Sequence, residues 1–263
     1  MRRQKTLLVD ADVIRYQIAF KNQDDVDWDD SGDVFSITNA TKAGWDTERF
    51  IDSLKEKFNT DSLVIVLSGQ HNFRTAWDET YKANRKDKPK PLLWGVVSDY
   101  LEWGDHGHPV RTIEPLEGDD VLGILHTGEL LGESIIVTID KDLYTVPGLI
   151  YRWSDASPKI TNVTPEDAAY FHLTQVLTGD QVDNYKGCPG ISEKRADAIR
   201  TEAESVEHFW EMIVEAYAKK GLTEDDAIHQ ARLAFILRDG WFHFGTGEIK
   251  RWTPDQLKNL GEN

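Results

Sequence analysis

The sequence predicts an α/β protein: a mostly parallel central sheet flanked by helices, followed by a C-terminal helical region. Apolar runs that suit strands alternate with helical patterns as far as about residue 160, and this order builds a parallel sheet with right-handed crossovers. The chain has 263 residues, 40% of them apolar, and nine Trp, which is enough to bury a sizeable core. Because helical patterns predominate further on, we expect an α/β core at residues 1–160 and a helical region at 161–263.

The predicted strands are short and separated by helices. They cover residues 6–9, 63–67, 110–113, 134–139 and 149–153. The clearest of them are continuous apolar runs, which are typical of strands buried on both faces of a sheet.

Helical periodicity places helices between and after these strands. The predicted helices cover residues 13–20, 47–58, 94–103, 117–127 and 164–177, and a further helix follows Ser192. Thr164 suits an N-cap and Pro165 the first helical position. Residues 24–33 hold six Asp together with Gly and Ser, which predicts an exposed loop.

Composition excludes several classes of protein. No apolar run approaches the roughly 18–20 residues of a membrane span, and the N-terminus leads directly into a strand rather than a signal peptide. A single cysteine, Cys188, excludes an internal disulfide and a multi-cysteine zinc site. We therefore expect a cytoplasmic protein that does not bind membranes.

The net charge of −16 argues at first against nucleic acid as a partner, because phosphate binding needs a basic surface. The charge is uneven, however. Residues 71–90 carry six Lys/Arg against three acids, and residues 186–200 carry four against two. Two basic patches on an acidic body are what a nuclease would show if its carboxylates hold cations and its patches hold phosphates.

Acidic residues follow three of the predicted strands. Their positions are Asp10, then Glu117, Asp119 and Asp120, then Asp140 and Asp142. Parallel strands end at one edge of a sheet, where ligands bind, so six carboxylates converge on one crevice. Clustered carboxylate oxygens suit Mg²⁺ or Mn²⁺.

Residues 115–121 (PLEGDDV) open a helix with three of these acids. Glu117 and Asp120 are three residues apart and share one helix face, while Asp119 lies beside them in the first turn. We interpret this stretch as half of a metal site. The alternative is that acids in a first turn only complement the helix dipole, each contributing roughly 0.3–1 kcal/mol.

A Gly/Pro-rich turn at residues 187–192 lies between two predicted helices. Backbone N–H groups at such a helix N-terminus form an anion site, which Lys194 and Arg195 would strengthen. The alternative is an ordinary helix hairpin with a solvated basic face.

Taken in order, these motifs resemble the phage and bacterial 5′-nuclease (flap endonuclease) family, and most of all its T7-type phage 5′→3′ exonucleases. The resemblance lies in LLVDAD at residues 7–12, NFR at 72–74, YKANRK at 81–86, LEGDDV at 116–121, DKD at 140–142, GDQVDN at 179–184, GCPGI at 187–191 and the helices of residues 222–237. It implies a PIN-like sheet-based core, a helical arch at about residues 71–92, and a helix-hairpin element that grips duplex DNA.

The resemblance also implies roles for single residues. Asp10, Glu117, Asp119 and Asp120 would serve a first metal ion or its water shell, and Asp140, Asp142, Asp180 and Asp183 a second. Arg74, Tyr81, Lys82, Arg85 and Lys86 would lie in the arch, with Lys82 and Arg85 joining Asp10 and Asp140 in catalysis. Gly187, Gly190, Ile191 and Ser192 would form the hairpin turn, with Lys194 and Arg195 next to it on the DNA; in relatives this turn also holds K⁺.

The resemblance implies a two-metal 5′→3′ exonuclease and flap endonuclease acting on duplex DNA at 5′ ends, nicks or flaps, with RNA in RNA–DNA hybrids as a further candidate substrate. Which cutting mode dominates stays open. One departure matters: the family usually has a metal-binding Asp after the second strand, where this chain has Ser68 and Gly69. The alternative function is therefore a structure-specific DNA-binding protein with weak or lost catalysis.

Overall fold

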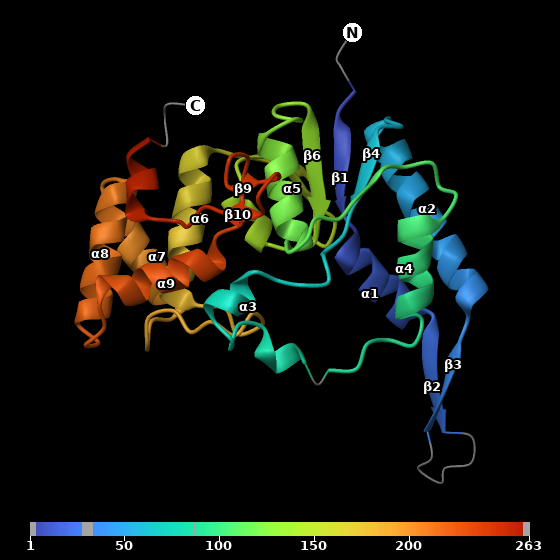
Figure 1. The fold of residues 1–263 in the computed structure, drawn as a ribbon, viewed down its shortest axis with the longest axis horizontal. Coiled ribbons are helices and arrows are strands. Elements are labelled where there is room, and N and C mark those ends of the chain that lie inside the picture. The colour runs from blue at the N-terminus through green and yellow to red at the C-terminus, as the bar shows by residue number, and fades with distance from the viewer. Residues whose placement is uncertain (1–3, 28–33, 87, 260–263) are drawn as a thin grey trace.

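The structure is a computed structural model that describes residues 4–27, 34–86 and 88–259. Its centre is a six-stranded sheet in the order β5-β4-β1-β6-β7-β8 (Figure 1). These strands are β1 (Thr6–Asp10), β4 (Leu63–Val66), β5 (Val110–Arg111), β6 (Ser134–Thr138), β7 (Gly148–Arg152) and β8 (Ile160–Val163). All neighbours are parallel except β7 and β8, which confirms the mostly parallel sheet.

The longer helices are α1 (Ala11–Lys21), α2 (Ala40–Phe58), α4 (Trp94–Trp103), α5 (Gly118–Thr127), α6 (Pro165–Thr178), α7 (Glu193–Glu202), α8 (Val206–Ala218) and α9 (Glu224–Ala234). The N-cap at Thr164 is confirmed, because its hydroxyl accepts the Asp167 N–H. Strand β8 spans the predicted boundary at residue 160, so the division into 1–160 and 161–263 remains a proposal. No helix within the described ranges is both long and apolar enough to cross a membrane.

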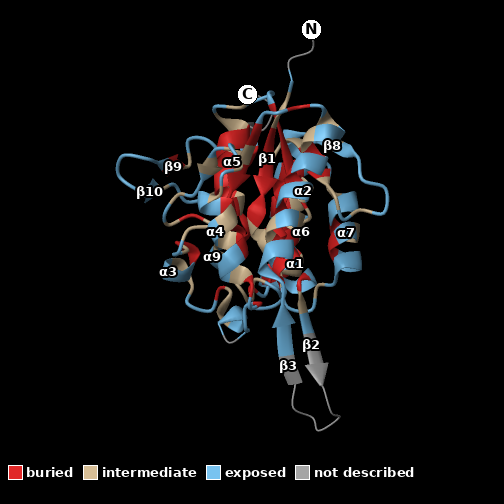
Figure 2. Ribbon diagram, turned by 90° about the vertical axis from the view of Figure 1, so that its right-hand side faces the viewer, coloured by how far each residue is buried: buried red, intermediate tan, exposed pale blue. Residues whose placement is uncertain are grey.

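The sheet separates two hydrophobic cores, because side chains alternate along each strand. Leu7 and Val9 belong to the core that includes residues of α1, α2 and α4, whereas Leu8 belongs to the core that includes residues of α5, α6, α8 and α9. Figure 2 shows the buried sheet between exposed outer helix faces. Asp10 is two residues after Leu8 and so points to the same face of the sheet, the face that α5 covers. It is the last residue of β1.

The prediction of a loop at residues 24–33 is wrong for its described part. Strands β2 (Gln23–Asp27) and β3 (Val34–Thr38) pair antiparallel over five residue pairs, and residues 28–33 lie outside the described residues. The hairpin projects from the body (Figure 1). Pairing between the two strands supplies hydrogen bonds to their backbone groups. The many Asp residues suggested a loop, although β3 (VFSIT) contains the β-branched and aromatic residues that are common in strands.

The predicted arch is a crossing segment with little helix. It begins with α3 (Arg74–Trp77), passes through the single 3₁₀ turn η1 (Ala83–Arg85) and ends at α4. In Figure 1 it runs below the sheet, from the side of α9 to the side of α1. The helical part of the predicted arch is thus limited, within the described residues, to the two short stretches α3 and η1.

His172 is a buried residue of α6 that contacts α9. Its Nε2 lies 2.8 Å from the carbonyl oxygen of Ala231, and its ring packs edge-on against Phe235 and Trp252. Burial lowers the pKa of His172 to about 4, so the folded protein favours the neutral ring.

Since an unfolded His titrates near 6.5, this contribution to stability is complete above pH 6.5 and is lost as pH falls toward 4. We expect the free energy of unfolding to fall over that range, by up to roughly 3 kcal/mol from this residue. His172→Gln should flatten the fall, measured by urea unfolding at pH 4.5 and 7, whereas exposed His243→Gln should not. Equal pH slopes in wild type and His172→Gln would contradict this assignment.

Candidate active site

A cavity of about 260 Å³ lies beyond the carboxyl ends of β1, β4 and β6. Seven of the residues predicted from the sequence line it: Asp10, Lys82, Arg85, Glu117, Asp119, Asp140 and Asp183. They come from five separate parts of the chain, and the parallel sheet brings them together. The predicted convergence of acids on one crevice is thus present in the fold.

Local structure positions each carboxylate. Asp10 ends β1, and its Oδ2 accepts the Thr138 hydroxyl at 2.7 Å. Asp140 lies two residues beyond β6 and accepts the Asp142 N–H at 2.8 Å. Glu117 is the N-cap of α5, and Asp119 is in its first turn.

Three of the acids have pKa values above the ordinary range of a carboxyl group. Burial, with Asp12 and Asp140 adding to it, raises the pKa of Asp10 to about 7. Burial also raises the pKa of Asp119, with Asp140 and Asp10 as further causes, and it raises the pKa of Asp142 to about 6, helped by Asp140. Mutual repulsion of this kind is relieved when a cation binds among the carboxylates.

Other acids of the site are already paired with cations. Lys82 Nζ contacts Glu117 Oε1 and lies 3.4 Å from Asp183 Oδ2, while Arg85 contacts Asp183 Oδ1. Burial would raise the pKa of Glu117, but Lys82 and Arg74 outweigh it and lower that pKa to about 2.

A second group of predicted ligands adjoins the cavity. Lys141 Nζ lies 3.0 Å from Asp142 Oδ1 and 3.7 Å from Asp180 Oδ2. Among the residues that the structure describes, no three His, Cys, Asp or Glu side chains stand together ready to hold a metal ion. Lysine and arginine side chains instead form ion pairs with several of the predicted ligands.

The prediction that Asp120 serves a metal is wrong. Its side chain is fully buried and forms a bidentate pair with Arg74, at 2.7 and 2.8 Å. Arg74 is itself 2% exposed, so its predicted contact with DNA is wrong as well. Glu117 and Asp120 do share a helix face, as their spacing predicted, but that face meets Arg74.

Tyr81 belongs to the crossing segment, but its side chain is buried rather than on the surface. It is 3% exposed, and its hydroxyl lies 3.1 Å from Glu117 Oε2 and 3.0 Å from Asp183 Oδ2. The predicted contact of Tyr81 with DNA is therefore wrong, and the residue holds two carboxylates of the site instead. Lys86 is exposed, and its DNA contact remains a prediction.

The predicted hairpin turn leads into α7. Ser192 is the N-cap of α7 and accepts the Arg195 N–H at 3.4 Å. Gly190, Ser192, Lys194 and Arg195 are exposed, Ile191 is half-buried, and Gly187 is buried with its N–H donating to Gln230. The basic side chains of Lys194 and Arg195 are thus on the surface next to the turn, whereas Gly187 is in its buried part.

Besides Ser68, the departure from the family pattern, five residues outside the predicted site line the cavity: Asp12, Val13, Arg15, Tyr16 and Trp94. Arg15 stacks 4.0 Å from the centre of the Trp94 ring, and Trp94 meets Tyr16 edge-on. Asp12 follows Asp10 by two residues, and its place in the first turn of α1 was the available signal.

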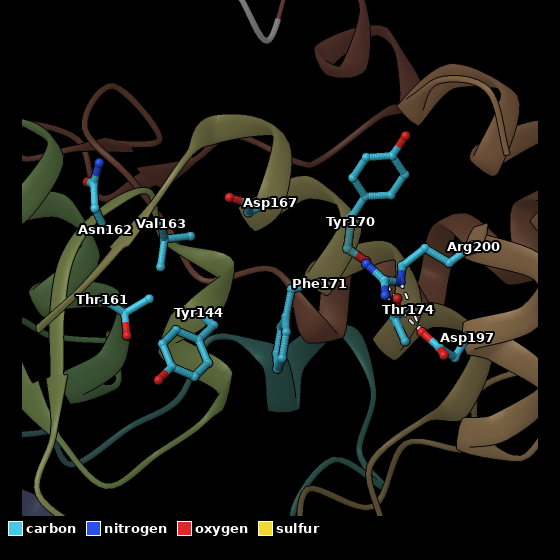
Figure 3. Close-up of a pocket in the computed structure, with 10 residues that line it drawn as sticks. All are labelled: Tyr144, Thr161, Asn162, Val163, Asp167, Tyr170, Phe171, Thr174, Asp197 and Arg200. Carbon is cyan, nitrogen blue, oxygen red and sulfur yellow. Dashed lines mark hydrogen bonds and ion pairs between the residues drawn. The ribbon is translucent and has the colours of Figure 1, made fainter. Parts of the chain in front are cut away.

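A larger cavity of about 430 Å³ lies elsewhere, among β8, α6 and α7 (Figure 3). Aromatic rings form much of its wall, and at its edge Arg200 is paired with Asp197 at 2.8 Å. None of the residues predicted for the active site lines it. Asp10, Asp119 and Asp140 line the smaller cavity and not this one, so the smaller cavity is the candidate active site.

The sequence of this chain is similar to those of known nucleases. A family model described as the N-terminal resolvase-like domain of 5′-3′ exonucleases matches residues 5–166. The exonuclease of Escherichia phage T7 is 27% identical, over 94% of this chain and 93% of its own length. The flap endonuclease Xni of Vibrio campbellii is 32% identical, over 65% of this chain and 70% of that protein.

Solved structures share the fold. The flap endonuclease of bacteriophage T5, in a complex with DNA and metal ions, has a TM-score of 0.67 at 17% identity and covers 87% of this chain and 88% of that one. The phage T5 5′-exonuclease with bound zinc has a TM-score of 0.64 at 18% identity, with the same coverage. Because the family model matches more than half of the chain, this protein belongs to the 5′-3′ exonuclease family.

Proposed function

We propose that this protein hydrolyses phosphodiester bonds at the 5′ ends of duplex DNA, as a metal-dependent 5′→3′ exonuclease and flap endonuclease. The observation that carries the proposal is the cavity in which uncompensated carboxylates lie directly beside the cations Lys82 and Arg85. Carboxylates suit divalent cations and the basic groups suit phosphate. RNA in RNA–DNA hybrids is a second candidate substrate, and we propose that the protein acts as a monomer.

The donor set fits two divalent ions, for which we propose Mg²⁺, with Mn²⁺ able to replace it. The first would be held by Asp10, Glu117 and Asp119, and the second by Asp140, Asp142, Asp180 and Asp183. Such ions supply Lewis-acid activation of water and neutralise charge on the phosphate. The oxygens are all carboxylate, and burial together with neighbouring carboxylates raises the pKa of Asp10 and of Asp119, which a bound cation would counteract.

Lys82 and Arg85 are proposed to stabilise the phosphate in the transition state. Hydrogen bonds hold their segment over the site: the Lys82 N–H donates to the Asp183 carbonyl at 2.9 Å, and Arg85 Nε donates to the Val182 carbonyl at 3.1 Å. Lys82 has a φ of 54°, a left-handed conformation that costs of order 1 kcal/mol in a non-glycine residue and is found at functional sites.

The turn at residues 187–192 and the first turn of α7 are proposed to hold the backbone of the duplex. The N-terminus of α7, with the exposed side chains of Lys194 and Arg195, suits phosphate. Carbonyl groups of the same turn are proposed to hold K⁺.

The direct test incubates the protein with 5′-labelled nicked, flapped and RNA–DNA hybrid substrates, with Mg²⁺ or with EDTA. We expect cleavage from the 5′ end that requires the metal. Metal-independent cleavage, or binding without cleavage, would contradict the proposal. The second outcome would favour the alternative of a DNA-binding protein without catalysis.

Variants in the crossing segment and variants at the start of α7 should differ in their effects on turnover and on DNA affinity. Lys82→Ala and Arg85→Ala should mainly lower turnover, because they act on the phosphate at the chemical step. Removing Lys82 also frees Glu117, so Mn²⁺ affinity should not fall. Measurements are single-turnover cleavage rates and Mn²⁺ titrations.

Lys194→Ala and Arg195→Ala should mainly weaken duplex affinity, and each should reduce the slope of log affinity against log salt by about 0.9. Lys159→Ala, an exposed lysine outside both regions, is the control. If both pairs of variants changed affinity alone, Lys82 and Arg85 would not act in catalysis.

A further inference from the structure

The end of β4 is the point where a carboxylate was expected and is missing. Of the two residues there, Ser68 lines the cavity and Gly69 does not. A Cβ at Gly69 would lie 2.9 Å from the carboxylate of Glu114, which the N–H groups of Gln70 and His71 hold in place. Position 69 therefore faces away from the site, and Ser68 is the residue whose side chain meets it.

The Asp12 carboxylate lies next to Ser68 and is hydrogen-bonded to it. Its Oδ2 accepts the Ser68 N–H at 3.0 Å and also the Ser68 hydroxyl. The Ser68 Oγ in turn accepts the Gly118 N–H at 2.8 Å. A chain of hydrogen bonds thus connects the start of α5 to the Asp12 carboxylate through Ser68.

The Asp12 carboxylate lies among the other acids of the site. Its Oδ2 is 2.9 Å from the place of a Cβ on Gly118, so only a glycine between Glu117 and Asp119 leaves room for it. It lines the same cavity as Asp10 and Asp119. Its other oxygen, Oδ1, is 2.5 Å from Arg15 Nη2, so a cation already sits on the side facing away from Ser68.

We propose that Asp12 supplies a further metal-facing carboxylate of this site, from the first turn of α1, and that Ser68 is the positioning residue that holds it. In this chain the carboxylate would thus come from α1, which follows β1, instead of from the end of the neighbouring strand β4. This inference rests on the proposed function, since it concerns the same divalent ions.

The test measures Mn²⁺ binding to the DNA-free protein by electron paramagnetic resonance, together with the Mg²⁺ concentration for half-maximal cleavage. Asp12→Asn should weaken Mn²⁺ binding by about tenfold or more and raise the Mg²⁺ requirement, while metal-free duplex affinity stays unchanged. Ser68→Ala should have the same effect in smaller degree. Glu114→Gln, an acid next to the same loop but outside the cavity, is the matched control and should change neither.

The exchange Asp12→Ser with Ser68→Asp returns the carboxylate to the end of β4. If Asp12 acts through its charge at this point, the exchanged protein should recover most of the Mn²⁺ affinity that Asp12→Ser alone loses. Recovery also distinguishes the proposal from a structural role of Asp12, and it can be measured even if Asp12→Asn fails to fold.

Unchanged Mn²⁺ affinity in Asp12→Asn, or no recovery in a folded exchanged protein, would overturn the role of Asp12 while the wild type still cleaves. Absence of Mn²⁺ binding and of cleavage in the wild type would instead overturn the proposed function, and this inference with it.

Discussion

Asp140→Asn is expected to abolish cleavage while leaving DNA binding intact. Asp140 adjoins both groups of acids, because it lines the cavity with Asp10 and Asp119 and accepts the Asp142 N–H at 2.8 Å. Losing one shared carboxylate should remove about 4 kcal/mol or more of transition-state stabilisation, which is on the order of a thousandfold in rate. The change is isosteric and removes a negative charge near the phosphate, so affinity for DNA should not fall.

The same variant should stabilise the metal-free protein. Asn keeps the carbonyl that accepts the Asp142 N–H, and it removes repulsion from the neighbouring carboxylates. Rates with Mg²⁺, duplex affinity with EDTA and urea unfolding test the three effects together. Asp61→Asn, whose side chain is 96% exposed, is the control. Wild-type turnover in Asp140→Asn would remove Asp140 from the active site.

Arg74→Met is expected to lower the free energy of unfolding by about 3–5 kcal/mol, the usual cost of stranding one partner of a buried ion pair. Arg74 donates to both oxygens of Asp120, and also to the carbonyls of Leu233 and Phe235 at 3.0 and 2.6 Å. It thus connects the start of the crossing segment to α5 and to the C-terminal end of α9. Without it, Asp120 would be a buried carboxylate lacking its cation.

A double variant separates the two causes of that loss. Arg74→Met with Asp120→Leu removes both charges, so it should be less destabilised than Arg74→Met alone. Arg200→Met breaks a surface pair with Asp197 and should cost no more than about 1 kcal/mol. Urea unfolding followed by tryptophan fluorescence measures all three. A near-wild-type stability for Arg74→Met would show that the pair is not structural.

Several features of the fold follow from local sequence. The apolar run at residues 6–9 is β1, the periodic stretch at 94–103 is α4, and Thr164 caps α6. These predictions succeed because strand burial, helical period and capping depend on a few neighbouring residues. The alternation of strands and helices then predicts a parallel sheet, and with it the convergence of Asp10, Asp119 and Asp140 at one edge.

Other features depended on residues distant in the chain. Local spacing showed that Glu117 and Asp120 share a face of α5, but the direction of that face depends on Arg74, 46 residues before Asp120. The hairpin of β2 and β3 likewise required pairing across the stretch of Asp residues.

The sequence by itself determined the α/β class, the family and most of the acids that line the cavity, because these follow from periodicity, order and motif. Only the tertiary structure decided which acids face the cavity and which face the core. It turned Asp120 toward Arg74 and brought Asp12 to Ser68, 56 residues away. The physical reason is that burial and pairing determine the role of a carboxylate, and both depend on contacts that no local pattern records.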